Sequence, residues 1–201
     1  QQSDGIPWRT HKQLMETTSP LVDCGVHYVD VMCQITDAKP VEVRGMGLRM
    51  SDEIASDMYN YGHLQVLFDD GSVGWYEAGW GPMMSETAFF VKDVMSPKGS
   101  VSIVMDPGAR SADHETHVRT DSIRVHHAEL GPDGKFARED VLVPTTGEPG
   151  HDALCAREQD FVYRAVTEDI DLTRHMNDAV QSLRICIAAD ESVRTGKAVK
   201  L

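Results

Sequence analysis

An aspartate and a histidine four residues apart are the residues of this chain best suited to do chemistry. Asp23 and His27 lie in residues 17–32, TTSPLVDCGVHYVDVM. In a helix, this spacing places a carboxylate and an imidazole on one face, one turn apart. Such a pair can exchange a proton near neutral pH, because histidine titrates there and a nearby carboxylate favours the imidazolium form. Asp30 completes the pattern D-x3-H-x2-D.

The same spacing has two other interpretations. Asp23 can be a first-turn carboxylate stabilised by the helix dipole, with His27 a hydrogen-bonded histidine half buried against a sheet. Alternatively, Cys24, Cys33 and the carboxylates can hold a metal ion, although the usual zinc spacings are missing and we expect no metal site. The local pattern alone leaves the catalytic and structural interpretations open.

Local signals predict a helix over residues 17–32. Ser19 is a suitable N-cap, and Pro20 falls at the first helical position, where its missing N–H costs nothing. Apolar residues then recur on one side of the helix: Leu21, Val22, Val26, Val29 and Met32. The catalytic candidates are therefore expected on a helix that packs against a core.

Strands dominate the middle of the chain and helices its end. Residues 69–71, Asp-Asp-Gly, predict a hairpin between alternating runs, and Gly196 predicts a helix C-cap. No crossover helix fits between the strands, which predicts an α+β fold with a largely antiparallel open sheet, helices on one face and the other face free. We expect an irregular lead-in at 1–16, strands at 41–50, 63–68, 72–80, 87–95, 100–105 and 122–129, a loop at 141–150, helices at 151–166 and 173–195, and a strand at 197–201.

Length and charge narrow the class of protein. The 201 residues, 41% hydrophobic and 25% charged, suit a single globular domain over 17–201. A net charge of −13 argues against binding to nucleic acid or an anionic membrane, which needs clustered Lys and Arg. The four cysteines are too sparse for a disulfide scaffold, and no signal peptide or membrane-length apolar run is present. These features indicate a cytoplasmic protein.

Three further residues are candidates for ligand binding. Trp8 and Arg9 can line a polar pocket as an aromatic wall beside a planar donor, or can be a core tryptophan next to a solvated arginine. His175, near the start of the helix at 173–195, can reach a site or lie on the surface. His114 and His117 fall in an acidic segment where metal binding is conceivable and a solvated loop is expected.

The chain carries no standard nucleotide-binding motif. Gly45 and Gly47 lie inside a predicted strand and lack the third glycine of G-x-G-x-x-G, and G-x4-G-K-[ST] does not occur. These residues therefore cannot by themselves form a standard dinucleotide or triphosphate site.

Three segments in order resemble the C-terminal domain of the glucose-fructose oxidoreductase / inositol dehydrogenase / MocA family of NAD(P)-dependent oxidoreductases. The family pattern D-x-G-x-H-x2-D is similar to DCGVHYVD at 23–30, and its F-x2-G signature resembles VLFDDGSVGWYEAGW at 66–80. Its closing helix, glycine and Val-x-Leu strand are similar to ICIAADESVRTGKAVKL at 185–201. The resemblance extends over essentially the whole chain.

The resemblance implies hydride transfer between a nicotinamide, NAD or NADP, and a hydroxyl-bearing carbon of a sugar or polyol. His27 matches the family's general base, and Asp23 matches the carboxylate that orients this base. Asp30 matches a position that we take as structural or substrate-orienting. Further candidates for substrate binding are Trp8, Arg9 and His175. The cofactor would be bound mainly by an N-terminal Rossmann domain that is absent here, so we expect the 201 residues alone to be inactive.

The family also uses the open face of its sheet to form homo-oligomers. A dimer or tetramer would give Trp75, Tyr76 or Trp80 a role, depending on which of them lies on that face. Two alternatives remain open: a stand-alone dimeric binding or scaffold module without catalysis, and a metal-dependent lyase or hydrolase that uses Asp23 and His27.

Overall fold

All strand pairs in the described part of the chain are antiparallel, and they form two four-stranded sheets. The computed structural model describes residues 5–83, 92–104 and 120–201. Contacts divide the chain into unit 1, Gln1–Ser85 with Glu168–Leu201, and unit 2, Glu86–Thr167. Helices with open antiparallel sheets confirm the predicted α+β class, with the strands shared between two sheets instead of one.

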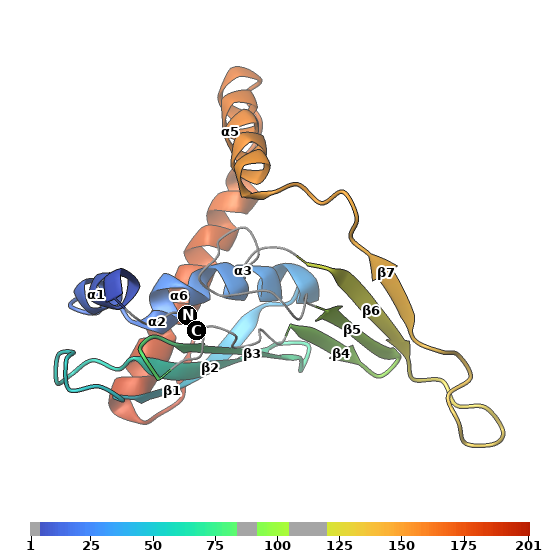
Figure 1. Ribbon diagram of the computed structural model, residues 1–201, viewed down its shortest axis with the longest axis horizontal. Helices are drawn as coiled ribbons and strands as arrows, with labels where there is room; N and C mark the ends of the chain where they lie inside the picture. Colours follow the sequence, from blue (N-terminus) through green and yellow to red (C-terminus); the bar gives the residue numbers. More distant parts are fainter. Residues whose placement is uncertain (1–4, 84–91, 105–119) are drawn as a thin grey trace. The chain divides into compact units, whose positions relative to one another are not determined.

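Unit 1 has helices packed on one face of a sheet with strand order β3-β2-β1-β8. Among these helices, α6 contacts β1 and β2, α3 contacts β3, and α2 contacts β2 and β3 (Figure 1). Its helices are α1 (Gly5–Leu14), α2 (Pro20–Asp23), α3 (Gly25–Thr36) and α6 (Thr173–Thr195), and its strands are β1 (Pro40–Leu48), β2 (Tyr61–Phe68), β3 (Val73–Gly79) and β8 (Val199–Lys200).

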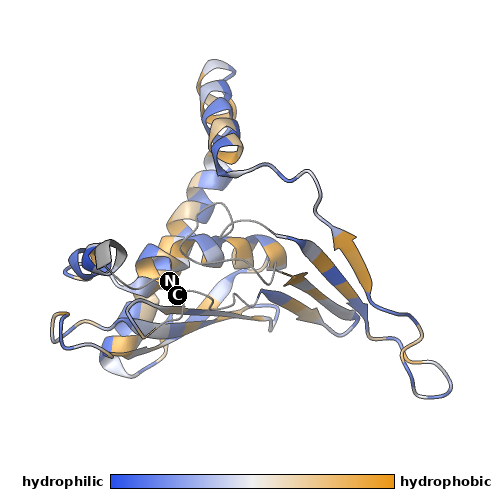
Figure 2. Cartoon of the chain, viewed as in Figure 1, coloured by the Kyte–Doolittle hydropathy of each residue, from blue (hydrophilic) through white to orange (hydrophobic). Residues whose placement is uncertain are grey.

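The core of unit 1 lies between this sheet and its helices. Alternate residues of a strand point to opposite faces, and Leu64, Val66 and Phe68 of β2 are buried on the helix side. Figure 2 shows both hydrophobic and hydrophilic residues along α6, and the buried positions 182, 185, 186, 189 and 192 recur at the three- and four-residue spacing of an amphipathic helix. The buried cluster comprises Leu21, Val29, Val43, Tyr59, Leu64, Val66, Phe68, Ile185, Cys186, Ala188 and Ala189.

Two turns and the last strand form as predicted. β2 and β3 pair through the Asp-Gly hairpin, where Gly71 has φ +85° and its N–H donates to the Phe68 carbonyl over 3.0 Å. Gly196 ends α6 in the left-handed region, φ +66°, and its N–H donates to the Ser192 carbonyl. β8 then pairs with β1. Glycine is favoured at both turns because no Cβ opposes a positive φ.

The prediction of an irregular lead-in at residues 1–16 is wrong, because Gly5–Leu14 form helix α1. Pro7 falls in the first turn of this helix, where a missing N–H is tolerated. α1 is held by tertiary contacts: Trp8 packs in a second buried cluster with Met15, Ile54 and Trp80. Those contacts involve residues distant in sequence, so the local sequence pattern did not reveal them.

Unit 2 contains a sheet of order β4-β5-β6-β7 and helix α5. The predicted loop at 141–150 is wrong for its first four residues, which form β7 and pair with β6. This strand is short and exposed along its length, and turn residues follow it directly. The sequence pattern therefore did not distinguish it from a loop. The elements are β4 (Asp93–Ser96), β5 (Gly99–Val104), β6 (Ser122–His127), β7 (Val141–Pro144) and α5 (His151–Thr167).

Some predictions fall outside the described residues. They include most of the strand predicted at 87–95, and His114 and His117. Within residues 5–83, 92–104 and 120–201, no helix has the length and apolar character needed to cross a bilayer. In the described part of the chain, no group of three or more His, Cys, Asp or Glu side chains is arranged to hold a metal ion.

Candidate functional site

Asp23 and His27 lie on either side of a helix junction. The single helix predicted over 17–32 is wrong: Asp23 is the last residue of α2, Cys24 caps it, and His27 lies in the first turn of α3. The break falls next to Gly25, a poor helix former that is buried against β3. A Cβ at Gly25 would lie 3.1 Å from Cε1 of Tyr76, so the junction approaches the sheet closely.

A buried hydrogen-bond network fixes the start of α2. Ser19 caps the helix as predicted, since its Oγ accepts from the Val22 N–H over 3.1 Å. The same hydroxyl donates to Oδ1 of Asp190 on α6 over 2.7 Å, and the Tyr59 hydroxyl donates to that oxygen as well. Burial and the Asp190 carboxylate raise the pKa of Tyr59. These hydrogen bonds join α2 to α6, far away in sequence, at Ser19, a few residues before Asp23 and His27.

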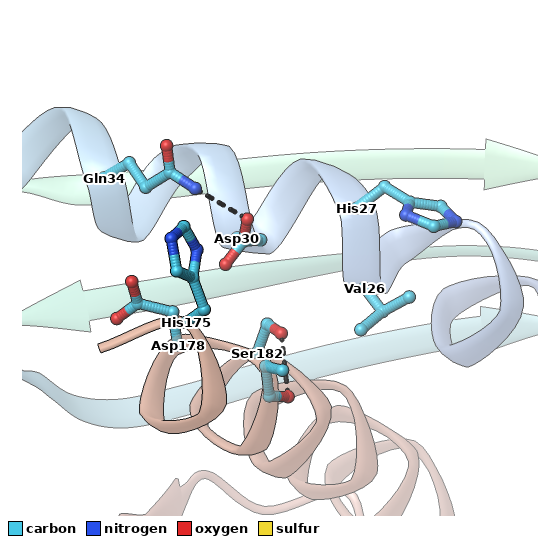
Figure 3. A pocket seen from close by; sticks show the side chains of 8 residues that line it. Val26, His27, Asp30, Gln34, His175, Asp178 and Ser182 are labelled. Carbon is cyan, nitrogen blue, oxygen red and sulfur yellow. Dashed lines mark hydrogen bonds between the residues drawn. The ribbon is translucent and has the colours of Figure 1, made fainter. Parts of the chain in front are cut away.

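His27 is exposed at the edge of a surface hollow of about 360 Å³ between α3 and α6. Figure 3 shows that His27 and Asp30 project from α3, whereas His175 and Asp178 come from the first turns of α6. The hollow is lined by Val26, His27, Asp30, Gln34, His175, Asp178, Ala179 and Ser182. Its volume is in the range of small-molecule sites, about 300–1,000 Å³.

Two carboxylates of the hollow have defined partners. Oδ2 of Asp30 accepts a hydrogen bond from Nε2 of Gln34 over 2.7 Å, one turn along α3 (Figure 3). Oδ2 of Asp178 lies 3.7 Å from Nε of Arg174, whose side chain is 74% exposed and is not part of the lining. The hollow therefore holds two carboxylates and two imidazoles, with one arginine outside it.

The predicted site residues are only partly brought together. His27, Asp30 and His175 share the hollow. Asp23 is not part of its lining, and its Oδ2 accepts instead from the Cys24 thiol over 3.4 Å. Trp8 is 7% exposed in the second buried cluster and Arg9 is exposed on α1, which matches the alternative of a core tryptophan beside a solvated arginine.

Sequence reasoning missed Asp178 and Gln34. Each lies one helical turn after a candidate that was identified, since Asp178 follows His175 by three residues and Gln34 follows Asp30 by four. That spacing places each pair on one helix face. The spacing was therefore a usable signal, but the approach of α6 to α3 was not visible in the sequence.

Cys24, between the two helices, should be a poorly reactive thiol. Burial, followed by the Asp23 carboxylate, raises its pKa from 9.0 to about 12. At pH 8 the thiolate fraction then falls about a thousandfold, so we expect alkylation by iodoacetamide to be at least about a hundredfold slower in the folded chain than in urea. Because the unfolded state loses its proton first, this thiol also destabilises the fold as the pH rises above about 9.

Tandem mass spectrometry of tryptic peptides after timed alkylation measures this rate, because fragment ions distinguish Cys24 from Cys33 on the same peptide. The same peptide from the urea-unfolded chain is the reference, which removes any difference in intrinsic reactivity. Equal rates in the two states would contradict the burial of Cys24.

Comparisons with known proteins agree with this architecture. A family model described as the GFO/IDH/MocA C-terminal domain matches residues 1–91. Aldose-aldose oxidoreductase from Caulobacter crescentus, solved with glycerol, matches with a TM-score of 0.68 at 20% identity, over 99% of this chain and 52% of that chain. No curated protein sequence matches this chain.

Two inositol dehydrogenases also share the fold. Myo-inositol 2-dehydrogenase from Lactobacillus plantarum matches with a TM-score of 0.61 at 19% identity, over 96% of this chain and 52% of that chain. Scyllo-inositol dehydrogenase from Lactobacillus casei, solved with NAD(H) and scyllo-inositol, gives 0.58 at 14% identity, over 98% and 62%. This chain therefore spans about half the length of the solved structures it matches. The family resemblance predicted from the sequence is confirmed over residues 1–91, which are similar to the GFO/IDH/MocA C-terminal domain.

Proposed function

We propose that this chain is the substrate-binding and oligomerisation domain of a cytoplasmic NAD(P)-dependent oxidoreductase that acts on a hydroxyl-bearing carbon of a sugar or polyol. The observation that carries the proposal is the exposure of His27 at the edge of a concave site, at the histidine position of the family motif. Asp23 precedes it at the end of α2, at the motif's carboxylate position.

His27 acts as the general base in this mechanism. The substrate lies in the hollow with the reacting hydroxyl at the imidazole, which accepts the hydroxyl proton while the carbon loses a hydride. Asp23 is the orienting carboxylate of the motif, and to reach the imidazole its side chain has to exchange the hydrogen bond that it accepts from the Cys24 thiol. Asp30 accepts hydrogen bonds from substrate hydroxyls, and its hydrogen bond with Gln34 holds its carboxylate in place. Reduction of a carbonyl substrate uses the same groups in reverse.

The cofactor is held mainly by another domain. Bound nicotinamide supplies the hydride acceptor, but its pyrophosphate needs a glycine-rich turn between a strand and a helix. Every strand pair described in residues 5–83, 92–104 and 120–201 is antiparallel, and this part of the chain offers no such turn. The residues described here therefore fit the binding of the substrate and not the binding of the cofactor's pyrophosphate.

A second candidate, a dimeric scaffold module without catalysis, is favoured by the exposed apolar side chains on the face of the unit 1 sheet opposite its helices. That face carries exposed apolar side chains, including Met46 at 66% and Trp75 at 53% exposure, and Trp75 stacks on His63. Tyr76, in contrast, lies on the helix side near Gly25, and Trp80 is buried. We propose that homo-oligomers, dimers or tetramers, form through this face in both cases.

Cofactor-dependent turnover tests the proposal. The natural gene product that contains these residues, purified and supplied with NAD or NADP, should reduce the cofactor in the presence of a sugar or polyol, followed by NAD(P)H absorbance. The 201-residue chain by itself should show no turnover. If the natural product lacks turnover with a panel of aldoses, inositols and linear polyols but still dimerises, the scaffold function replaces the enzymatic one.

A further inference from the structure

We propose that the wall of the hollow formed by α6 is a specificity subsite, in which Asp178 and Asp30 together select neutral polyhydroxylated substrates over anionic ones such as sugar acids and sugar phosphates. This inference rests on the proposed function and deepens it. It assigns a role to Asp178, which lies outside the motif that identifies His27.

The subsite is built on rigid elements. α3 and α6 pack against each other and share the buried core, to which Val29 contributes from α3 and Ile185 from α6. Ser182, at the base of the hollow, is buried, and its hydroxyl donates to the Ala179 carbonyl over 3.1 Å. The two walls therefore hold their side chains at a fixed separation, as specificity requires.

The polar lining matches hydroxyl groups. Each carboxylate can accept hydrogen bonds from two neighbouring hydroxyls, and the Gln34 amide and the imidazoles can both donate and accept. Val26 and Ala179 supply apolar surface for the C–H face of a ring or chain. A neutral polyol satisfies all these groups at once.

The charges of the lining disfavour an anion. Asp30 and Asp178 face the hollow from opposite helices, and the lining contains no Lys or Arg. Arg174 approaches Asp178 from outside the lining and also lies 3.8 Å from Asp37, so one arginine is shared between two carboxylates. A ligand carboxylate or phosphate therefore meets negative charge that Arg174 compensates only in part. Repulsion from one carboxylate at contact distance in water weakens the binding of an anion roughly fivefold.

Ligand titration of the 201-residue chain tests this selection. Proton–carbon NMR follows the imidazole signals of His27 and His175 at pH 8, where histidine side chains are ordinarily neutral. The ligands are two neutral compounds, glucose and scyllo-inositol, and their anionic counterparts, glucuronate and inositol monophosphate. We expect the neutral compounds to shift both imidazoles and to bind at least about fivefold more tightly than the anions.

Charge-removing variants assign the effect to the subsite. D178N should lower the preference for neutral ligands by up to about fivefold, and D30N should lower it similarly. E191Q, which removes an exposed charge thirteen residues further along α6 and outside the lining of the hollow, should leave the preference unchanged. The unchanged NMR spectrum of core methyl groups establishes that each variant is folded.

The outcomes separate this inference from the proposed function. Neutral ligands that shift His27 but not His175, or a preference that D178N leaves unchanged, would overturn the subsite while the proposed function stands. If none of the four ligands shifts His27, both proposals fail. A D178N variant that gains affinity for the anions alone, with its affinity for glucose retained, is the strongest support.

Discussion

Replacing His27 with alanine in the natural protein should lower kcat for polyol oxidation by about 10²–10⁴-fold, the usual contribution of a positioned general base. Without the imidazole, no group at this edge of the hollow accepts the hydroxyl proton as the hydride leaves. The His27 side chain is exposed and lies in the first turn of α3, so its removal should not change the stability of the fold. Steady-state rates, measured across pH, test this result.

The pH profile distinguishes lost catalysis from lost binding. A general base makes the rate rise with pH as it loses its proton, and the alanine variant should lose this rise. Asp23→Asn should lower kcat less than His27→Ala does, because the Asp23 carboxylate is not part of the lining of the hollow. KM should change little in either variant, since the rest of the hollow remains.

His127→Ala is a matched control, because this histidine lies on β6 of unit 2 and is not part of the lining of the hollow. It should retain wild-type kcat and an unchanged pH profile. Wild-type activity in His27→Ala would remove His27 from the mechanism, and Asp30 or His175 in the same hollow would be the next candidates for the base.

Sequence patterns predicted the structure correctly where interactions between residues close in sequence determine it. The Asp-Gly hairpin forms because its tight turn needs a residue that tolerates positive φ, and Gly71 has φ +85°. Ser19 caps α2 through a bond to Val22, three residues away. The alternation of β2 between buried and exposed side chains could be read directly, because a half-buried strand has a period of two.

Long-range packing explains what the sequence did not reveal. The break between α2 and α3 depends on the contact of Gly25 with Tyr76 on β3, and α1 is held by the contact cluster of Trp8 with Trp80. Likewise, Asp178 enters the hollow only because α6 packs against α3. In each case the partner lies tens of residues away, where periodicity and capping carry no information.

The same packing predicts the largest effect on stability. Gly45 and Gly47 allow β1 to pack closely against α6. Their role is thus in packing, and not in a nucleotide-binding motif. A Cβ at Gly45 would lie 2.4 Å from the Ala189 carbonyl oxygen, well inside van der Waals contact and against backbone that cannot rotate away. We expect Gly45→Ala to lower the free energy of unfolding by about 3 kcal/mol, because α6 must shift away from the sheet.

The Gly45 N–H adds a second constraint, since it donates to Oγ of Ser192 over 2.9 Å. Ser192 is buried, and its hydroxyl in turn donates to the Lys197 carbonyl over 2.6 Å, directly before β8. Displacement of α6 would therefore weaken the pairing of β8 with β1 as well as the core. Urea unfolding followed by circular dichroism should show a lower midpoint for Gly45→Ala with an unchanged slope.

Gly74→Ala on β3 is the matched control for this prediction. A Cβ there would also be close to its neighbour, 2.7 Å from Sδ of Met32, but that atom belongs to a flexible side chain that can adopt another rotamer. This variant should lose less than about 1 kcal/mol, because the methionine moves and no helix has to shift. Equal losses in the two variants would mean that α6 is free to move away from β1, and that the α6 wall of the hollow, with His175 and Asp178, is not rigidly placed.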